Sequence, residues 1–278
     1  MKNHLKRSYD IHSDQFIEFY DELPLWSAPF GLRLLDNVKL QKNITALDIG
    51  FGSGFPLIEL AMRLGNTCRV YGIDPWETAS QRVEKKIAFF NINNIELIRG
   101  EAENIQLSDH SIDVIVSNNG INNVSDLDKT LSECARILKS GGQLLLSMNL
   151  NTTMSEFYEM MERILREMHM NVTIAAMHRH IYAKRKPLDE FVSLLKKKAF
   201  DINNIDFNQF EYKFVDGTTM LNHYFIQCAF LESWKQFIPS ESYESIFAEI
   251  ENRMNKEAEL DGFLKLSVPF VVIDCKRR

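Results

Sequence analysis

One short stretch of this chain, residues 46–56, constrains the fold more than any other. It reads ALDIGFGSGFP, so an apolar segment that contains an acidic residue runs into three alternating glycines. Glycine has no Cβ and adopts positive φ values readily, so a ligand can lie against the main chain of such a loop. The helix expected after the loop presents free N–H groups in its first turn. The stretch therefore predicts a strand, a ligand-binding turn and a helix, in that order.

The acidic residue of this stretch, Asp48, narrows the kind of ligand. A carboxylate at the loop repels a pyrophosphate and attracts the ammonium group of an amino acid. Dinucleotide-binding sites usually keep this position free of charge, so that the pyrophosphate can lie at the helix N-terminus. A nicotinamide-binding domain of the same fold is the rival interpretation, and Asp48 argues against it. A tight turn without a ligand is the plainer alternative.

Further apolar segments follow at the intervals of an alternating strand and helix pattern. Strands are expected at residues 70–74, 96–99, 112–119 and 140–147. Asp74 ends the first of them, about 20 residues after the last loop glycine, where a βαβ unit places its ribose-binding acid. Strands that alternate with helices predict a doubly wound, mostly parallel sheet with its ligands at the carboxyl ends of the strands.

Together these segments resemble a known family. The ordered motifs LDIGFGSG, VYGID, GEAENIQLSDHSIDVIVSN and ECARILKSGGQLLLS look like the class I S-adenosylmethionine-dependent methyltransferases. They are most similar to the small-molecule branch that includes the ubiquinone/menaquinone methyltransferases (methyltransferase type 11-like). The resemblance covers roughly residues 44–150. It implies a Rossmann-like fold, S-adenosylmethionine as the cofactor and methyl transfer as the activity.

The resemblance also implies which residues hold the methionine and ribose parts of the cofactor. Gly50, Gly52 and Gly54 match the glycines that approach the methionine part. Asp48 matches the acid directed towards its amino group. Asp74 matches the acid that accepts hydrogen bonds from both ribose hydroxyls, which suits a carboxylate because it is only an acceptor.

A second implied group surrounds the adenine ring. The Glu101 carboxylate matches the acceptor from the adenine amino group, and the Ala102 backbone N–H matches the donor to the ring. Trp76 lies where the family often has an apolar residue beside the adenine, although a tryptophan that only shields the surface is the alternative. Asn118, at the end of the fourth strand, completes the expected cofactor-binding residues.

The chain departs from the family after the fourth strand. Quinone-type relatives often carry histidines there, whereas this chain has asparagines, among them the expected substrate-binding residues Asn119 and Asn122. Asparagine cannot take up a proton at neutral pH, but it can orient an acceptor by hydrogen bonds. We therefore expect either a general base from elsewhere in the chain or a reaction that needs none.

Residues 1–43 are expected to form an N-terminal helical lid segment, since such a segment often folds over the cofactor in the resembling family. Aromatic residues recur there at near-helical spacing: Tyr9, Phe16, Phe19 and Tyr20. Prolines then predict a loop at residues 23–31, in which Trp26 and Phe30 are candidate substrate-binding residues. Packing of the lid's aromatic rings onto the sheet is the alternative.

The chain after the fifth strand is expected to close the sheet and to cover the acceptor. Helices are predicted at residues 154–170 and 188–199, an extended segment at 200–214 and an antiparallel final strand at 263–275. Two helical patterns, at residues 218–237 and 241–260, make this segment too long for a hairpin loop. We therefore expect an inserted helical cap at 216–260, and a methyltransferase core formed by residues 44–215 and 261–278.

The predicted cap begins with a His-Tyr pair. His223 is the candidate general base, because neutral imidazole suits proton removal near pH 7, and Tyr224 is a candidate substrate contact. A surface or hydrogen-bonded histidine without a catalytic role is the alternative, as it is for His178 and His180. The acceptor is expected between the Trp26 loop and the cap.

The composition limits the partners. The 278 residues carry a formal net charge of −6 and only short basic runs, which argues against nucleic acid as the acceptor. The 4 cysteines show no CxxC spacing, so no metal site is expected. No apolar run reaches the roughly 18 residues of a membrane-spanning helix, and no apolar signal segment follows the first six residues. We therefore expect a cytoplasmic protein without membrane insertion.

The sequence thus predicts an enzyme that transfers a methyl group from S-adenosylmethionine to a small-molecule acceptor bound under a helical cap. A monomer and a homodimer are both compatible with it. The alternative from another class is a non-catalytic sensor or scaffold that binds S-adenosylmethionine or S-adenosylhomocysteine. Turnover with a panel of metabolites separates the two.

Overall fold

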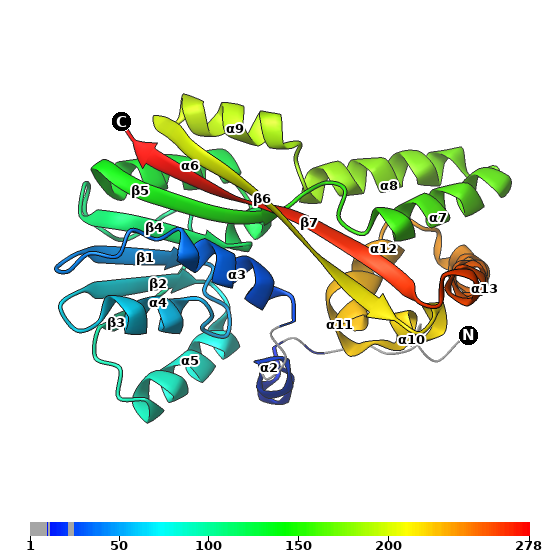
Figure 1. Cartoon of the computed structure of the whole chain (residues 1–278), viewed down its shortest axis with the longest axis horizontal. Helices are drawn as coiled ribbons and strands as arrows, with labels where there is room; N and C mark the ends of the chain where they lie inside the picture. The colour runs from blue at the N-terminus through cyan, green and yellow to red at the C-terminus, as the bar shows by residue number, and fades with distance from the viewer. Residues whose placement is uncertain (1–9, 11, 22–24) are drawn as a thin grey trace. The chain divides into compact units, whose positions relative to one another are not determined.

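The apolar segments predicted from the sequence form one seven-stranded sheet in the computed structural model (Figure 1). The strands are β1 (Thr45–Ile49), β2 (Arg69–Asp74), β3 (Ile95–Arg99), β4 (Ile112–Asn118), β5 (Leu138–Asn149), β6 (Phe200–Phe214) and β7 (Leu264–Arg277). Their order across the sheet is β3-β2-β1-β4-β5-β7-β6. Strands β1 to β5 pair in parallel, and β7 runs antiparallel to β5. This order confirms the Rossmann-like doubly wound sheet with an antiparallel final strand.

The structure describes residues 10, 12–21 and 25–278, which divide into two compact units. Of these residues, the larger unit contains 12–21, 25–149, 187–208 and 270–278. The smaller unit contains 10, 150–186 and 209–269. Both β6 and β7 contribute residues to each unit. No helix of the described residues is long and apolar enough to cross a membrane.

The strand order reverses at β1, which lies between β2 and β4. The chain builds β2 and β3 to one side of β1 and then returns to place β4 and β5 on the other side. In doubly wound sheets, the loops that leave such neighbouring strands diverge at their carboxyl ends and open a crevice. The glycine loop after β1 and the asparagines after β4 therefore meet at one edge of the sheet.

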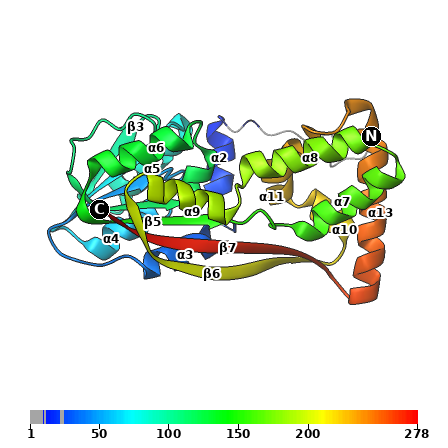
Figure 2. The same cartoon turned by 90° about the horizontal axis from the view of Figure 1, so that it is seen from above.

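Helices cover both faces of the sheet in the larger unit. They are α2 (Asp14–Asp21), α3 (Ser27–Asp36), α4 (Leu57–Leu64), α5 (Glu77–Phe89), α6 (Leu127–Ile137) and α9 (Leu188–Lys197). Figure 2 shows α3 and α4 on one side of the sheet and α6 and α9 on the other. Strands β1 and β4 are accordingly buried along nearly their whole length, as expected for parallel strands covered on both faces.

The smaller unit is mostly helical. Its helices are α7 (Ser155–Glu167), α8 (Asn171–Lys184), α10 (Gly217–Asn222), α11 (Tyr224–Ile226), α12 (Glu232–Lys235) and α13 (Tyr243–Asp261), with a π-helical turn at Gln227–Leu231 and a 3-10 turn at Ser240–Ser242. Trp234 anchors its core: the indole is fully buried, stacks on Phe157 with ring centroids 3.6 Å apart, and donates a hydrogen bond to the Tyr158 hydroxyl at 3.1 Å. A large aromatic ring with its N–H satisfied is a strong packing element.

Two local predictions need correction. The loop expected at residues 23–31 is wrong from Ser27 onwards, because α3 begins there and includes Pro29. Pro29 is the third residue of the helix, where the missing N–H has no intrahelical partner to lose. The continuous helix expected at residues 218–237 is instead broken into the short pieces α10, α11, a π-helical turn and α12.

Some predicted features lie outside the described residues. Among the aromatic residues of the expected lid segment these are Tyr9 and the side chains of Phe19 and Tyr20. Residues 23 and 24 of the expected loop lie outside them as well. The helices expected between residues 218 and 260 lie in the smaller unit, together with α7 and α8.

Candidate cofactor-binding site

A pocket of about 350 Å³ opens in the larger unit, at the carboxyl ends of β1, β2 and β4. Its lining residues come from five segments within 26–27, 49–55, 73–76, 100–102 and 118–124. A volume of this size is sufficient for a small metabolite or part of a cofactor. Five loops that are far apart in sequence therefore converge on one site.

Most of the predicted cofactor-binding residues line this pocket. They are Gly50, Gly52, Asp74, Trp76, Glu101, Ala102 and Asn118, joined by the predicted substrate-binding residues Trp26 and Asn119. Four other predicted residues of the larger unit are absent from the lining: Asp48, Gly54, Phe30 and Asn122. His223 and Tyr224 belong to the smaller unit.

Two glycines allow the loops after β1 and β4 to approach each other. Gly50 has φ +77°, and a Cβ on it would lie 2.8 Å from Gly120 Cα. A Cβ on Gly120 would in turn lie 2.4 Å from the Ile49 carbonyl oxygen. Gly52 differs, since its φ is +52° but a Cβ there would meet nothing within 4 Å. The left-handed backbone conformation favours glycine at position 52, and close packing requires it at position 120.

Asp74 is held by backbone donors. Its Oδ2 accepts from the Gly52 N–H at 2.8 Å and its Oδ1 accepts from the Trp76 N–H at 2.8 Å. Burial raises the pKa of Asp74, and these two hydrogen bonds lower it in part. Each carboxylate oxygen can accept about two hydrogen bonds, so one site on each remains for a ligand donor. The carboxylate is thus oriented in advance for a pair of neighbouring hydroxyls.

Asp48 is in the opposite situation. Its side chain is fully buried, and neither oxygen has a hydrogen-bond partner among the described residues. Burial is the main cause that raises the pKa of Asp48 well above its usual value, and the charge of Asp74 adds to it. The Leu57 N–H offsets a part of this rise without reaching hydrogen-bonding geometry. A buried carboxylate without a partner fits a site that holds a cationic group nearby.

The asparagines after β4 are bonded mainly to the protein itself. Asn118 Nδ2 donates to the Ser27 carbonyl at 3.0 Å, and Asn118 Oδ1 accepts from the Ser147 hydroxyl at 2.7 Å. Both ends of this amide are therefore used to hold α3 and β5 against β4. Asn119 Oδ1 accepts from the Asn149 N–H and from Asn122 Nδ2, at 3.2 and 2.9 Å. The Asn119 Nδ2 is buried and has no acceptor among the described residues.

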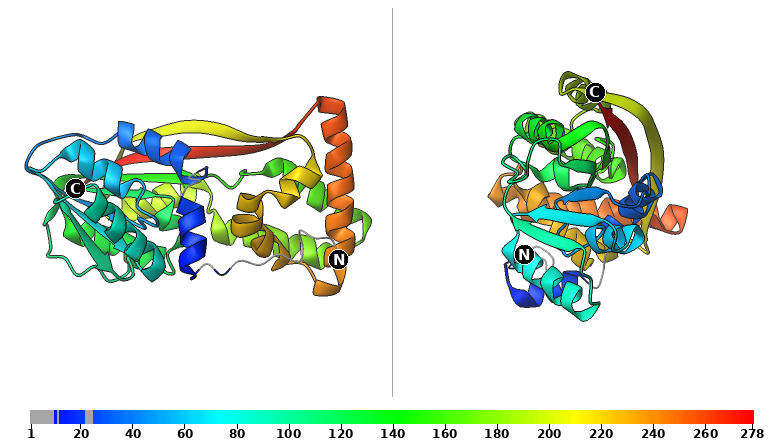
Figure 3. Two further views of the ribbon diagram at one scale, coloured as in Figure 1. Left: turned by 90° about the horizontal axis from the view of Figure 1, so that it is seen from below. Right: turned by 90° about the vertical axis from the view of Figure 1, so that its left-hand side faces the viewer.

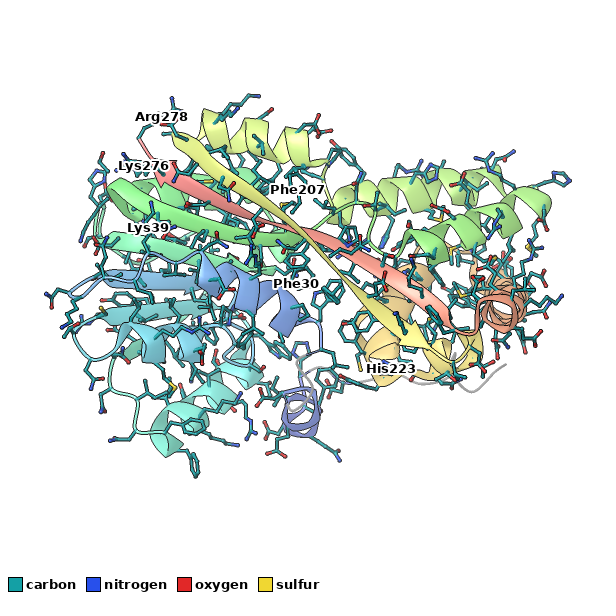
Figure 4. All side chains as sticks on the ribbon, viewed as in Figure 1. Phe30, Lys39, Phe207, His223, Lys276 and Arg278 are labelled. Carbon is teal, nitrogen blue, oxygen red and sulfur yellow. The ribbon has the colours of Figure 1, made fainter. Side chains whose placement is uncertain are left out.

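The two aromatic residues predicted for the acceptor have different positions. Trp26 lines the pocket and immediately precedes α3. Phe30 is fully buried in α3, with its ring centroid 5.1 Å from that of Trp26 and 4.7 Å from that of Phe270 (Figure 4). The structure therefore places Phe30 behind Trp26, as its packing support.

The candidate bases lie in the smaller unit. His223 stands between α10 and α11 (Figure 4), with its ring centroid 4.9 Å from Tyr224 and 5.4 Å from Phe214. Burial lowers the pKa of His223, so the imidazole is neutral at pH 7. His180 contacts the Ser233 hydroxyl at 2.9 Å, and His178 contacts Glu162 at 2.9 Å. A catalytic role for His223 stays a prediction.

The comparison with known families agrees with this geometry. Residues 47–146 match the methyltransferase domain family Methyltransf_11. The chain contains an S-adenosylmethionine-dependent methyltransferase domain. The match falls inside the region, roughly 44–150, whose motifs suggested the resemblance. It includes β2 to β4 and most of β1 and β5.

Curated relatives of the methyltransferase domain are similar over part of their length. The chain is 29% identical over 153 residues to a probable cobalt-precorrin-6B C(15)-methyltransferase (decarboxylating) of Saccharolobus solfataricus. The aligned region covers 54% of this chain and 75% of the relative. It is 30% identical over 128 residues to the demethylmenaquinone methyltransferase of Staphylococcus aureus. That aligned region covers 46% of this chain and 52% of the relative. The chain thus spans about half the length of the demethylmenaquinone methyltransferase that it matches.

Solved structures share the fold of the methyltransferase domain at low identity. The YcgJ protein of Bacillus subtilis aligns with a TM-score of 0.57 and 17% identity, covering 90% of this chain and 99% of that one. The geranyl diphosphate C-methyltransferase of Streptomyces coelicolor A3(2) was solved with Mg²⁺, geranyl diphosphate and S-adenosylhomocysteine. It aligns with a TM-score of 0.56 and 15% identity, covering 100% of this chain and 88% of that one. At such identities the likeness shows the fold alone.

Several lining residues of the methyltransferase domain were not predicted: Ser27, Phe51, Ser53, Phe55, Pro75, Asn123 and Val124. The position of Phe55 depends on a contact with α3, where a Cβ on Gly31 would lie 2.2 Å from the ring. A glycine inside a helix costs about 1 kcal/mol relative to alanine, so Gly31 is a signal of close packing once α3 is known to be a helix. The prediction of a loop at this place hid that signal.

Proposed function

We propose that this chain transfers the methyl group of S-adenosylmethionine to a small-molecule acceptor. One observation carries the proposal: Asp48, a buried carboxylate without a hydrogen-bond partner among the described residues, lies next to a glycine loop that lines the same pocket as Asp74. A cationic amino acid group and a ribose diol are the two features of the cofactor that these acids suit. The match of the domain family supports the same cofactor.

The proposed roles follow the environment of each residue. Asp48 balances the ammonium group of the cofactor through its charge, which acts strongly because the surroundings are buried. Asp74 accepts from the ribose hydroxyls with the two acceptor sites that Gly52 and Trp76 leave unused. The Ala102 N–H and the exposed Glu101 carboxylate are proposed for the adenine edge. The Asn118 amide is held by Ser27 and Ser147, which leaves one N–H and one acceptor site for the cofactor.

The cofactor, when bound, supplies a methyl group activated by a positively charged sulfur. The chain's own contribution is to align the reactants and to exclude water, which is worth roughly 7–11 kcal/mol when two groups are well positioned. Among the lining residues, the ionisable side chains are Asp74 and Glu101. The described lining contains no histidine, lysine or cysteine.

The acceptor side of the proposal is therefore assigned to residues outside this lining. We propose residues 216–260 as the cap that covers the acceptor, with Tyr224 in contact with it. His223 is the proposed base for acceptors that must lose a proton, which its lowered pKa supports, because the imidazole is then neutral and able to take up a proton at pH 7. The indole of Trp26 in the lining supports an acceptor that is partly apolar.

Calorimetry followed by turnover tests the proposal. The purified chain should bind S-adenosylhomocysteine and S-adenosylmethionine and show no comparable heat with NAD. Incubation with radiolabelled S-adenosylmethionine and a panel of phenols, quinols, amines and thiols should then label at least one class. Tight binding of NAD without a response to either sulfur compound would contradict the cofactor. Cofactor binding without transfer to any member of a broad panel would favour the sensor or scaffold alternative.

A further inference from the structure

One face of α5 holds the N-terminal helix α2. The residues of this face are Thr78, Arg82 and Lys86, spaced four residues apart and so stacked along one side of the helix. Thr78 Oγ1 donates to the His12 carbonyl at 3.0 Å, and Arg82 Nε donates to Asp21 Oδ2 at 3.0 Å. Figure 3 shows α2 beside α5 in the larger unit. The contacts join the residue His12, just before α2, and the last residue of α2 to the same helix.

Lys86 makes a second contact that the other two do not make. Its Nζ donates to Asp21 Oδ1 and also to the carbonyl oxygen of Ser53 at 2.8 Å. Ser53 belongs to the glycine loop and lines the pocket. A single ammonium group therefore bridges the end of α2 and the loop on which the proposed cofactor lies.

The bridge is partly shielded from water. The Asp21 side chain is 8% exposed and that of Lys86 is 23% exposed, so their charge-assisted hydrogen bond is screened less than a surface pair. Elsewhere in the loop, a Cβ on Gly54 would lie 3.1 Å from Val83 Cγ2 of α5. The glycine loop thus contacts α5 at two neighbouring points, one apolar and one a hydrogen bond from the Lys86 ammonium to a backbone carbonyl.

We propose that Lys86 is a positioning residue that couples the docking of α2 to the conformation of the glycine loop. The inference rests on the proposed function, since it takes the pocket to be the cofactor site. With α2 docked, Asp21 fixes the Lys86 ammonium where it reaches the Ser53 carbonyl. Without Asp21, the ammonium turns towards water and the loop loses this hydrogen bond. Because such coupling is reciprocal, a ligand that orders the loop also favours docked α2.

Two measurements on the full chain test the coupling. Hydrogen exchange of the peptide that covers residues 12–21 is followed with and without S-adenosylhomocysteine. The dissociation constant of S-adenosylhomocysteine is measured by calorimetry for wild type, Lys86→Met, Asp21→Asn and the double variant. The matched control is Lys85→Met, because Lys85 is the exposed neighbour on the same helix.

We expect S-adenosylhomocysteine to slow exchange in α2 of the wild type. Each single variant should weaken binding about 5-fold, at the lower end of coupling effects because Lys86 is partly exposed. Asp21→Asn also removes the charge that pairs with Arg82, so the double variant should be no weaker than Asp21→Asn. Lys85→Met should behave as wild type in both measurements.

Three outcomes would speak against the coupling. If wild type binds S-adenosylhomocysteine and α2 exchange is the same with and without it, the coupling is wrong and the proposed function stands. The same holds if Asp21→Asn speeds exchange in α2 while its affinity equals that of wild type. Wild type that fails to bind S-adenosylhomocysteine would overturn the proposed function, and the coupling with it. If Lys86→Met fails to fold, Asp21→Asn still tests the coupling, because Asp21 lies outside the pocket lining.

Discussion

Asp48→Asn should make the ligand-free chain more stable and its cofactor site weaker. The carboxylate is fully buried without a hydrogen-bond partner among the described residues, so its ionised form is destabilised by the fold. An unsatisfied buried polar group costs about 1–3 kcal/mol, and a charged one costs more. Replacing the charge by an amide of nearly equal shape should therefore raise the free energy of unfolding at pH 8 by about 1–3 kcal/mol, with a residual cost for the amide.

The sign of the pH dependence follows from the direction of the pKa shift. Burial raises the pKa of Asp48 in the folded chain above its unfolded value, so the folded state binds the proton more tightly. The stabilisation from this bound proton is full below the unfolded pKa of about 3.9 and is lost as the pH rises through the raised folded pKa. The gain from Asp48→Asn should therefore be largest at pH 8 and shrink as the pH falls.

Denaturant unfolding and calorimetry measure the two effects. In the presence of S-adenosylhomocysteine the stability gain of the variant should shrink towards zero, because the variant loses the attraction between the carboxylate and the ammonium group. We expect a loss of about 1–3 kcal/mol in binding, which is roughly 5- to 150-fold in the dissociation constant. Asp109→Asn is the control, since that carboxylate is largely exposed and paired with Arg136. Lower stability of Asp48→Asn at pH 8 with unchanged affinity would refute the reasoning.

Three further predictions concern other positions. Asp74→Ala should lose about 2–4 kcal/mol of affinity for S-adenosylhomocysteine in calorimetry, the scale of two hydrogen bonds to a charged group, whereas an unchanged dissociation constant would remove Asp74 from the site. Gly120→Ala should destabilise the chain by about 1–3 kcal/mol in thermal unfolding, because the new Cβ would lie 2.4 Å from the Ile49 carbonyl oxygen. A melting temperature equal to that of wild type would contradict this packing. Trp26→Ala and His223→Ala should lower the rate of methyl transfer far more than the affinity for the cofactor. The loss of rate in His223→Ala should depend on pH. Equal losses in rate and affinity for either variant would argue against an acceptor role for that residue.

The sequence predicted those parts of the site whose geometry is local. A strand, a glycine loop and a helix fix the positions of Gly50 and Gly52 from neighbouring residues alone, and Asp74 follows at the end of the next strand. The positions of Asn118 and Phe30 depend on partners far away in the chain. Asn118 lines the pocket, and its amide is held there by Ser27 and Ser147, 91 and 29 residues distant. No local pattern contains these pairings.

The helix α3 shows how a local rule failed. Proline marks a break when it lies inside a helix, but Pro29 lies in the first turn, where its missing N–H costs nothing. Gly31 then reads as a second loop signal, although its role is to let the helix lie close to Phe55 and Asn118. Both residues are explained by packing over a distance, which a one-dimensional pattern does not record.

The two acids at the ends of β1 and β2 have different environments in one site. Asp74 is bonded to two backbone N–H groups, so its orientation is fixed before any ligand arrives. Asp48 pairs in register with Gly72 of β2, two residues before Asp74. It therefore lies in the interior, where no described residue is hydrogen-bonded to its side chain. A fold selected for stability alone would have an apolar side chain at position 48, since the sheet buries it completely. The carboxylate is better explained by a positive charge that the ligand brings, so stability given up by the free chain becomes affinity in the complex.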